Sequence, residues 1–316
     1  MTLGARKALA IREINILLAL IVLGVVFFAK NHNFAGQLNT ETLLQQLAYF
    51  ALLAIGETFV IITGGIDLSP GSVLALSGLS VALLMHAGLP PLLAVIVVLI
   101  GSGLIGAVHG FYVTKLRVPP FVITLGTLGI ARGVAAVLTK GFRVPVPESF
   151  AAFGSTSLGG VVPLAAIVTF GIAGAAFAIL NYTSLGRSIF AVGGSIQAAR
   201  LSGVNVDRTR MFCYVTATTL AGLAGVFITS MQGAGDPTVG GGYELIAIAA
   251  VVIGGTSLAG GEGTIIGTLV GAAIMVILPN GLVVSIGMSP YYQPIVIGAA
   301  VVLAVTVDSV RRAKRK

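Results

Sequence analysis

Ten apolar runs fill most of the 316-residue chain and leave only short polar connections between them. About 20 consecutive apolar residues form a helix long enough to cross a bilayer. Because every backbone polar group in lipid needs an internal partner, such runs predict helices. The runs lie at about 14–29, 43–63, 71–86, 92–114, 121–138, 161–180, 211–231, 243–258, 264–283 and 292–307. The sequence therefore predicts an all-α polytopic membrane protein, a bundle of about ten transmembrane helices.

Several runs are too short for a full crossing. We expect the third, eighth and tenth to be tilted, broken or partly re-entrant, which is typical of helices that build a pathway. Charged residues make up only 9% of the chain, against about 25% in soluble domains. So few charges cannot solvate a soluble surface, and we interpret residues 1–316 as a single transmembrane domain.

The basic residues predict the orientation, because cytoplasmic loops are enriched in Lys and Arg. Counting connections from a cytoplasmic N-terminus places 14 of the 18 Lys and Arg residues inside. The inner residues are Arg6, Lys7, Arg12, Lys115, Arg117, Arg187, Arg200, Arg208, Arg210, Arg311, Arg312, Lys314, Arg315 and Lys316. Both termini are then cytoplasmic and the loop 140–160 is outside. Eight spans satisfy the same rule almost as well.

A polar turn with the sequence GGIDLSPG interrupts the apolar chain at residues 64–71. Irregular backbone at membrane depth is tolerated only where protein buries it or where it lines a water-filled cavity. Asp67 is an ionisable residue there and hence a candidate functional residue. Its simpler role is to cap the third helix. Four of the positions recur as Gly254, Gly255, Leu258 and Gly261, which leaves both duplication and chance open.

The longest inner connection, residues 181–210, contains a short helix. Ser195 is a plausible N-cap and Gly203 a plausible stop. A helix of about two turns is marginal in water and needs a surface to pack on. It packs on its own protein or, as we expect, docks the apolar face around Ala199 into a partner's groove. The predicted docking helix comprises Ser195, Gln197, Ala198, Ala199, Arg200, Leu201, Ser202 and Gly203.

Three blocks of sequence resemble the permeases of ATP-binding-cassette (ABC) importers for ribose and related monosaccharides. They are residues 64–71, the pair AVGG at 191–194 and AARLSGV at 198–204, and residues 242–261. The resemblance extends through residues 280–282 and 289–293, so it covers most of the chain in order. Two positions depart from it: related permeases typically carry Asn at Ser195 and often Asp at Ile246. The second departure places the substrate in doubt.

The resemblance implies a membrane-spanning importer subunit in the bacterial inner membrane. It implies a separate ATPase subunit that binds ATP and Mg²⁺, a second permease chain, identical or not, and an extracytoplasmic sugar-binding protein. This chain would bind no cofactor and would not be an enzyme. Since a sugar is neutral, its path needs hydrogen-bonding groups. The candidate pathway residues are Gly64, Gly65, Asp67, Ser69, Thr127, Gln232, Asn280 and Gln293, with Thr63 and Thr124 as further hydroxyls.

Glu57 and Arg132 are charges within predicted spans, so both should face the interior of the bundle as structural residues. They are candidates to pair with each other. The three histidines have no ligand spacing, no nucleotide-binding loop is present, and neither a metal site nor a nucleophile motif is predicted. Two alternatives stay open: a permease for another small polar solute, and an ion-coupled secondary transporter with Asp67 at its ion site.

Overall fold

The computed structural model describes the backbone of residues 3–313 and the side chains of residues 13–310. Its helices are α1 (Leu3–Lys30), η1 (His32–Ala35), α2 (Gln37–Ile62), α3 (Pro70–His86), α4 (Pro91–Thr114), α5 (Pro120–Thr139), α6 (Glu148–Ser155), α7 (Leu164–Tyr182), α8 (Ser184–Gly194), α9 (Ile196–Leu201), α10 (Val206–Gln232), α11 (Tyr243–Ile253), α12 (Ile265–Val284), η2 (Pro290–Tyr292) and α13 (Gln293–Ala313). Two small antiparallel ladders pair β1 (Val144–Pro145) with β4 (Ala234–Gly235) and β2 (Ser157–Leu158) with β3 (Val162–Pro163).

The membrane prediction is confirmed. Within the described residues, eight helices are long and apolar enough to span a membrane, and α3 and α11 are shorter apolar helices. At 11 residues, α11 extends only about 17 Å, roughly half of a hydrocarbon core of about 30 Å. The expectation of short third and eighth spans is therefore correct. The tenth is a full-length span of 21 residues, Pro290–Val310, so that part of the expectation is wrong.

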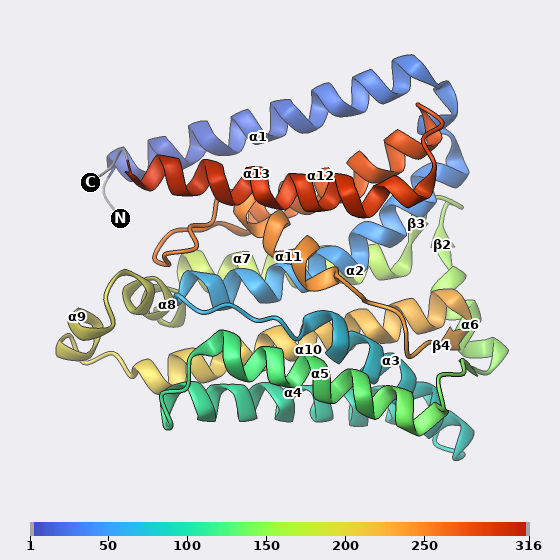
Figure 1. The fold of residues 1–316 in the computed structure, drawn as a ribbon, viewed down its shortest axis with the longest axis horizontal. Coiled ribbons are helices and arrows are strands. Elements are labelled where there is room, and N and C mark those ends of the chain that lie inside the picture. Colours follow the sequence, from blue (N-terminus) through green and yellow to red (C-terminus); the bar gives the residue numbers. More distant parts are fainter. Residues whose placement is uncertain (1–2, 314–316) are drawn as a thin grey trace.

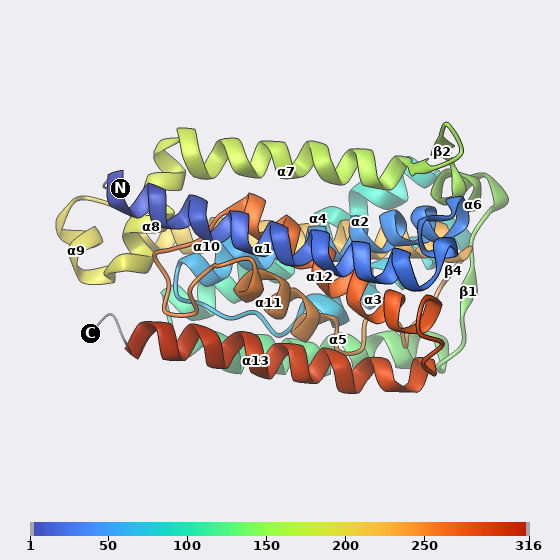
Figure 2. The same ribbon diagram turned by 90° about the horizontal axis from the view of Figure 1, so that it is seen from above.

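The long helices run side by side along one axis, with α2 and α10 in the middle of the bundle (Figures 1 and 2). From Ala48 to Ile62, α2 is almost completely buried, and much of α10 is buried as well. In contrast, α1 and α13 lie at the periphery, where only 6% of each spanning window is buried. Their apolar side chains are suited to lipid contact, since hydrocarbon tails solvate them.

Glycine permits the close approach of the central helices. A Cβ atom at Gly225 of α10 would lie 2.1 Å from the carbonyl oxygen of Leu74 in α3. A Cβ atom at Gly106 of α4 would lie 2.5 Å from the carbonyl oxygen of Tyr214 in α10. A Cβ at Gly56 of α2 would lie 2.8 Å from the Ala217 Cα. Small residues at helix contacts are the usual means of packing in lipid, where dispersion replaces the hydrophobic effect.

The two ends of the bundle differ in their connections. The start of α1, the helices α8 and α9 and the end of α13 share one end, which we call the α9 end (Figure 1). The α4–α5 connection, with Lys115 and Arg117, lies there too. At the opposite, α6 end lie α6 and the short strands (Figure 2). Lys314, Arg315 and Lys316 lie outside the described residues. Which end faces the cytoplasm stays a prediction.

Candidate functional site

Two short helices begin inside the bundle and meet at their N-termini. The chain reaches α3 through the extended segment 64–69 and reaches α11 through the loop 236–242 (Figure 1). A Cβ at Gly71 would lie 2.2 Å from the Gly240 carbonyl oxygen and 2.6 Å from Oε2 of Glu244. The positive ends of two helix dipoles therefore converge, and the Glu244 carboxylate lies at the start of α3. Discontinuous helices of this kind build substrate sites in membrane transporters.

Asp67 organises the segment before α3. Its Oδ1 accepts hydrogen bonds from the Ser69 amide at 2.8 Å and from the Ser69 hydroxyl at 2.7 Å, and all these groups are fully buried. The Asp67 amide in turn donates to Oε1 of Glu57 at 3.1 Å. Asp67 thus fixes the turn through backbone N–H bonds, as predicted, but Ser69 and not Asp67 occupies the N-cap position of α3.

The glycines of this turn have separate tasks. Gly64 has a φ of +78°, which a residue with a side chain rarely adopts. Gly65 makes a close approach instead, because a Cβ there would lie 2.5 Å from the Tyr214 hydroxyl oxygen. Both pathway candidates are explained by the conformation of the turn. Whether they also contact substrate stays a prediction.

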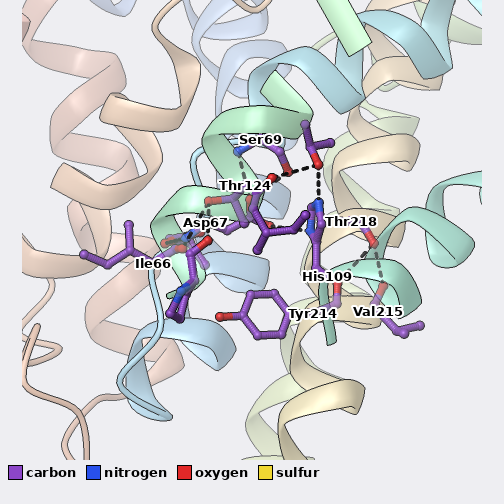
Figure 3. Close-up of polar contacts among 12 residues, drawn as sticks. Ile66, Asp67, Ser69, His109, Thr124, Tyr214, Val215 and Thr218 are labelled. Carbon is purple, nitrogen blue, oxygen red and sulfur yellow. Dashed lines mark hydrogen bonds and ion pairs between the residues drawn. The ribbon is translucent and has the colours of Figure 1, made fainter. Parts of the chain in front are cut away.

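Four buried polar atoms around Asp67 have no hydrogen-bond partner: Oε2 of Glu57, Oδ2 of Asp67, Nδ1 of His109 and the Tyr214 hydroxyl. Figure 3 shows the Tyr214 hydroxyl directed toward the Asp67 turn, with His109 beside it. Nδ1 of His109 lies 4.0 Å from Oδ2 of Asp67. Buried polar atoms are nearly always bonded, so this cluster is a candidate functional site within the bundle. Sequence reasoning missed His109 and Tyr214; the signal for His109 was its position within an apolar run.

Side chains of α5 complete this cluster and hold the facing loop. The Thr127 hydroxyl lies 2.8 Å from Nε2 of His109, and the Thr124 hydroxyl contacts the Ile66 carbonyl at 3.4 Å. Arg132 donates through Nη1 to the carbonyl oxygens of Pro237 and Val239 in the loop before α11. The suggested pair between Glu57 and Arg132 is therefore wrong. Glu57 lies at the Asp67 turn, while Arg132 is used to hold the loop.

A backbone junction links the predicted docking helix to this turn. A Cβ at Gly193, near the end of α8, would lie 1.7 Å from the Ile62 carbonyl oxygen and 2.5 Å from the Gly261 amide nitrogen. The Gly261 amide donates to that same Ile62 carbonyl at 2.9 Å. So α8, the end of α2 and the turn before α12 meet with no side chain between them. The two glycine blocks that resemble each other in sequence are neighbours in space.

The helix α9 is built as the sequence predicts but faces differently. The Ser195 hydroxyl accepts from the Ala198 amide at 3.2 Å, and Gly203 follows with a φ of +80°. Ala199 is 3% exposed and packs with Val192 and Val206 of its own chain, so its expected role as the docking side chain is wrong. Leu201, in contrast, is 91% exposed and lies on the free face of the helix.

Two further pathway candidates line a cavity of about 250 Å³ between α2, α11, α12 and α13. Asn280 and Gln293 contribute amides to it, and Ile246 contributes an apolar wall. Gln232 lies apart from both places, exposed at the end of α10. Within the part of the chain that the structure describes, the Asp67 cluster and this cavity are therefore two separate polar regions of the bundle.

Known proteins are similar to this sequence along most of its length. Residues 39–305 match the family described as "Branched-chain amino acid transport system / permease component". The ribose import permease protein of Escherichia coli (strain K12) is 44% identical over 299 residues, which cover 93% of this chain and 92% of that protein. The chain belongs to this permease family. The short helices α3, α11 and α9 described above are therefore parts of a transport subunit.

Other relatives differ in the solute that they are named for. The ribose import permease protein of Bacillus subtilis (strain 168) is 40% identical, covering 92% of this chain and 91% of that protein. The D-allose transport system permease protein of Escherichia coli (strain K12) is 37% identical, covering 85% of this chain and 83% of that protein. The relatives named here carry the names of monosaccharides, although the family description names amino acids.

Proposed function

We propose that this chain is the membrane-spanning subunit of an ABC importer for a monosaccharide, ribose or a sugar like it. The observation that carries the proposal is the 44% identity to a ribose import permease over 93% of the chain. The chemistry of the cavity agrees with it, because all the residues that line the cavity are neutral. An amino acid would need buried charges to pair with its ammonium and carboxylate groups.

The proposed importer has three further components: an ATPase subunit that binds ATP and Mg²⁺, a second permease chain and an extracytoplasmic sugar-binding protein. We place the α9 end in the cytoplasm of a bacterial cell and the α6 end outside, in accordance with the basic residues. The described part of this chain would bind no cofactor itself. An ATPase that pulled on α9 would act through α8 on the backbone junction at Gly193, and so on the Asp67 turn and α12.

The docking contact on the ATPase side is Leu201. An exposed leucine on a short capped helix can be buried when the helix lays its apolar face into a hydrophobic groove of a partner. A carboxylate at this position would be desolvated without a partner, at a cost of about 1–3 kcal/mol. Leu201→Asp should therefore insert normally but lose stimulation of the ATPase. Leu158→Asp is a matched control, since Leu158 is also exposed but lies at the α6 end.

The test is transport by the reconstituted importer. Vesicles that contain the permease, its ATPase and its binding protein should take up D-ribose when ATP is enclosed and should ignore protonophores. Uptake should fall strongly in Leu201→Asp and persist in Leu158→Asp. Uptake that follows an ion gradient without ATP would favour the secondary-transporter alternative instead. Uptake of leucine but no sugar would contradict the monosaccharide proposal.

A further inference from the structure

The cavity between α2, α11, α12 and α13 combines aromatic walls with unused hydrogen-bonding groups. Tyr49 of α2 and Tyr243 of α11 are stacked, with ring centroids 5.9 Å apart and planes at 8°. Phe50 packs against Tyr243, with ring centroids 4.7 Å apart. Three amide side chains, Gln46, Asn280 and Gln293, line the same space. Pockets for small molecules have this composition, mainly apolar and aromatic with a few placed polar groups.

Two acceptors at this cavity lack their ordinary partners. Asn280 donates its Nδ2 to Asn39 at 3.0 Å, while its Oδ1 is buried without a hydrogen bond. Pro279 lies inside α12 and has no N–H, so the carbonyl of Met275 four residues earlier lacks its intrahelical donor. Met275 also lines the cavity. Buried acceptors without donors are costly, so hydroxyl groups of a bound molecule that reached these acceptors would lower that cost.

The lining excludes most other ligands. None of the residues that line the cavity is charged, so an ion or an amino acid would be desolvated without compensation. A lipid tail would leave the amides and the free acceptors unsatisfied. The volume of about 250 Å³ lies below the range of about 300–1,000 Å³ for drug-sized ligands. A small, neutral and polyhydroxylated molecule fits these conditions.

The position of the cavity agrees with capture from outside. Gln46 lies in the first half of α2, Asn280 near the end of α12 and Gln293 at the start of α13. These parts of the three helices lie in the half of the bundle that is remote from α9 (Figure 1). In the proposed orientation this is the extracytoplasmic half, where a sugar would arrive.

We propose that this cavity is a monosaccharide-binding site within the single permease chain, a station on the path separate from the Asp67 cluster. The identity of the sugar rests on the proposed function, but the class of ligand follows from the lining. Gln46 and Asn280 would contact the hydroxyl groups of the sugar, and the stacked tyrosines would cover its C–H face.

The experiment measures protection of a reporter cysteine in the purified permease in lipid nanodiscs. The native Cys213 is fully buried and provides a low background. Ile297→Cys places a thiol in the cavity wall, and Tyr291→Cys places one at a site that is 91% exposed. D-ribose should slow the labelling of Ile297→Cys by a small thiol reagent in a saturable manner. It should leave Tyr291→Cys unchanged, and L-leucine should protect neither.

Matched amide variants decide whether the cavity itself binds the sugar. Gln46→Leu and Asn280→Leu should each abolish protection, whereas Gln45→Leu should preserve it, since Gln45 is the neighbouring residue and does not line the cavity. Protection by decanoate but not by D-ribose, D-allose or D-xylose would overturn the proposal in favour of an apolar occupant. A reporter that no reagent reaches would also overturn it, because a sugar needs a water-accessible site.

The outcomes separate this proposal from the proposed function. ATP-driven D-ribose uptake that survives Gln46→Leu, with no protection in the nanodisc, would refute the cavity site and leave the importer intact. Protection that is lost in Gln46→Leu, together with a failure of ATP-driven uptake, would refute the importer and retain the site.

Discussion

Asp67 shows how a membrane protein keeps a carboxylate at depth by using it for the backbone. An extended segment inside a helical bundle has amides without helical partners, and one oxygen of Asp67 accepts two hydrogen bonds from Ser69. Its other oxygen, Oδ2, has no hydrogen-bond partner and faces His109. One oxygen of Asp67 therefore holds the turn, while the other is directed at His109 and takes no part in holding the backbone.

This division leads to a graded prediction for substitutions of Asp67. Asp67→Asn keeps a carbonyl acceptor for Ser69, so insertion and thermal stability should stay close to those of the parent. Asp67→Leu leaves the buried amide and hydroxyl donors of Ser69 unsatisfied, which should lower the free energy of unfolding by about 1–3 kcal/mol for each lost partner. Uptake per inserted molecule should drop more in the Leu variant than in the Asn variant. Parental uptake by Asp67→Leu would show that the turn needs no acceptor there.

Asp236, in the loop before α11, provides a pH prediction. Burial alone would raise the pKa of this carboxyl, but hydrogen bonds from Thr238 and Arg143 outweigh burial and lower it. A lowered pKa in the folded state contributes stability that is fully present above the ordinary value of about 3.9 and is lost as the pH falls through the folded-state pKa.

The corresponding variant is Asp236→Asn, which keeps the shape and removes the charge. Its melting temperature should lie below that of the parent at neutral pH, and the difference should shrink as the parent is acidified. The effect should be modest, because Arg143 is 71% exposed and exposed ion pairs contribute about 0.2–1 kcal/mol. A difference that stays constant down to the acid limit would assign the stabilisation to shape and not to charge.

At this scale the sequence predicts the turn but not its partners. Gly64, Asp67 and Ser69 were identifiable because glycine and short polar side chains act on their own backbone, a local effect. Glu57 was placed correctly in the interior but assigned the wrong partner, since the position of Arg132 depends on a loop more than 100 residues away. Tyr214 carried no signal, as an aromatic residue inside an apolar run is typical core.

The elements show the same division between local and distant information. The short third and eighth runs, the cap at Ser195 and the stop at Gly203 follow from run length and capping chemistry, and the structure has all of them. The face of α9 was assigned wrongly because a helix of six residues has too short a pattern to show which side packs. Ala199 is inside because it packs with Val192 and Val206 of the flanking helices and with Val204.

The junction of α8 with α2 and α12 allows a matched pair of neighbouring substitutions. Gly193→Ala would place a Cβ 1.7 Å from the Ile62 carbonyl oxygen, so the junction must open. Gly194→Ala meets nothing within 4 Å and has the better helix propensity. We expect Gly193→Ala to lower both thermal stability and coupled uptake, and Gly194→Ala to leave both unchanged or slightly improved. Equal thermal stability and equal uptake in the two variants would mean that the close packing of α8 at this junction is not required.

At the scale of the whole molecule, the fold class is easy to predict from the sequence, whereas the arrangement of the helices is not. Lipid offers no hydrogen bonds to the backbone, so a long apolar run in a membrane forms a helix. The all-α membrane class can therefore be predicted from hydropathy. Which helices pack against each other cannot be predicted in this way, because it depends on contacts such as those of Gly225 with Leu74 and of Gly56 with Ala217. Those contacts unite segments far apart in the chain and place α2 and α10 at the centre.

The orientation of the molecule is testable because both candidate faces carry exposed serines. Ser149 lies at the α6 end and Ser202 directly after α9, and both are exposed. Since basic residues gather at the α9 end, Ser149→Cys should react with a membrane-impermeant thiol reagent in intact cells. Ser202→Cys should react only after the cells are permeabilised, and the buried native Cys213 should stay unlabelled in both cases. Labelling of Ser202→Cys in intact cells would reverse the topology. It would then place α9 outside, where no ATPase reaches it, and the proposed coupling route through Gly193 would fall with it.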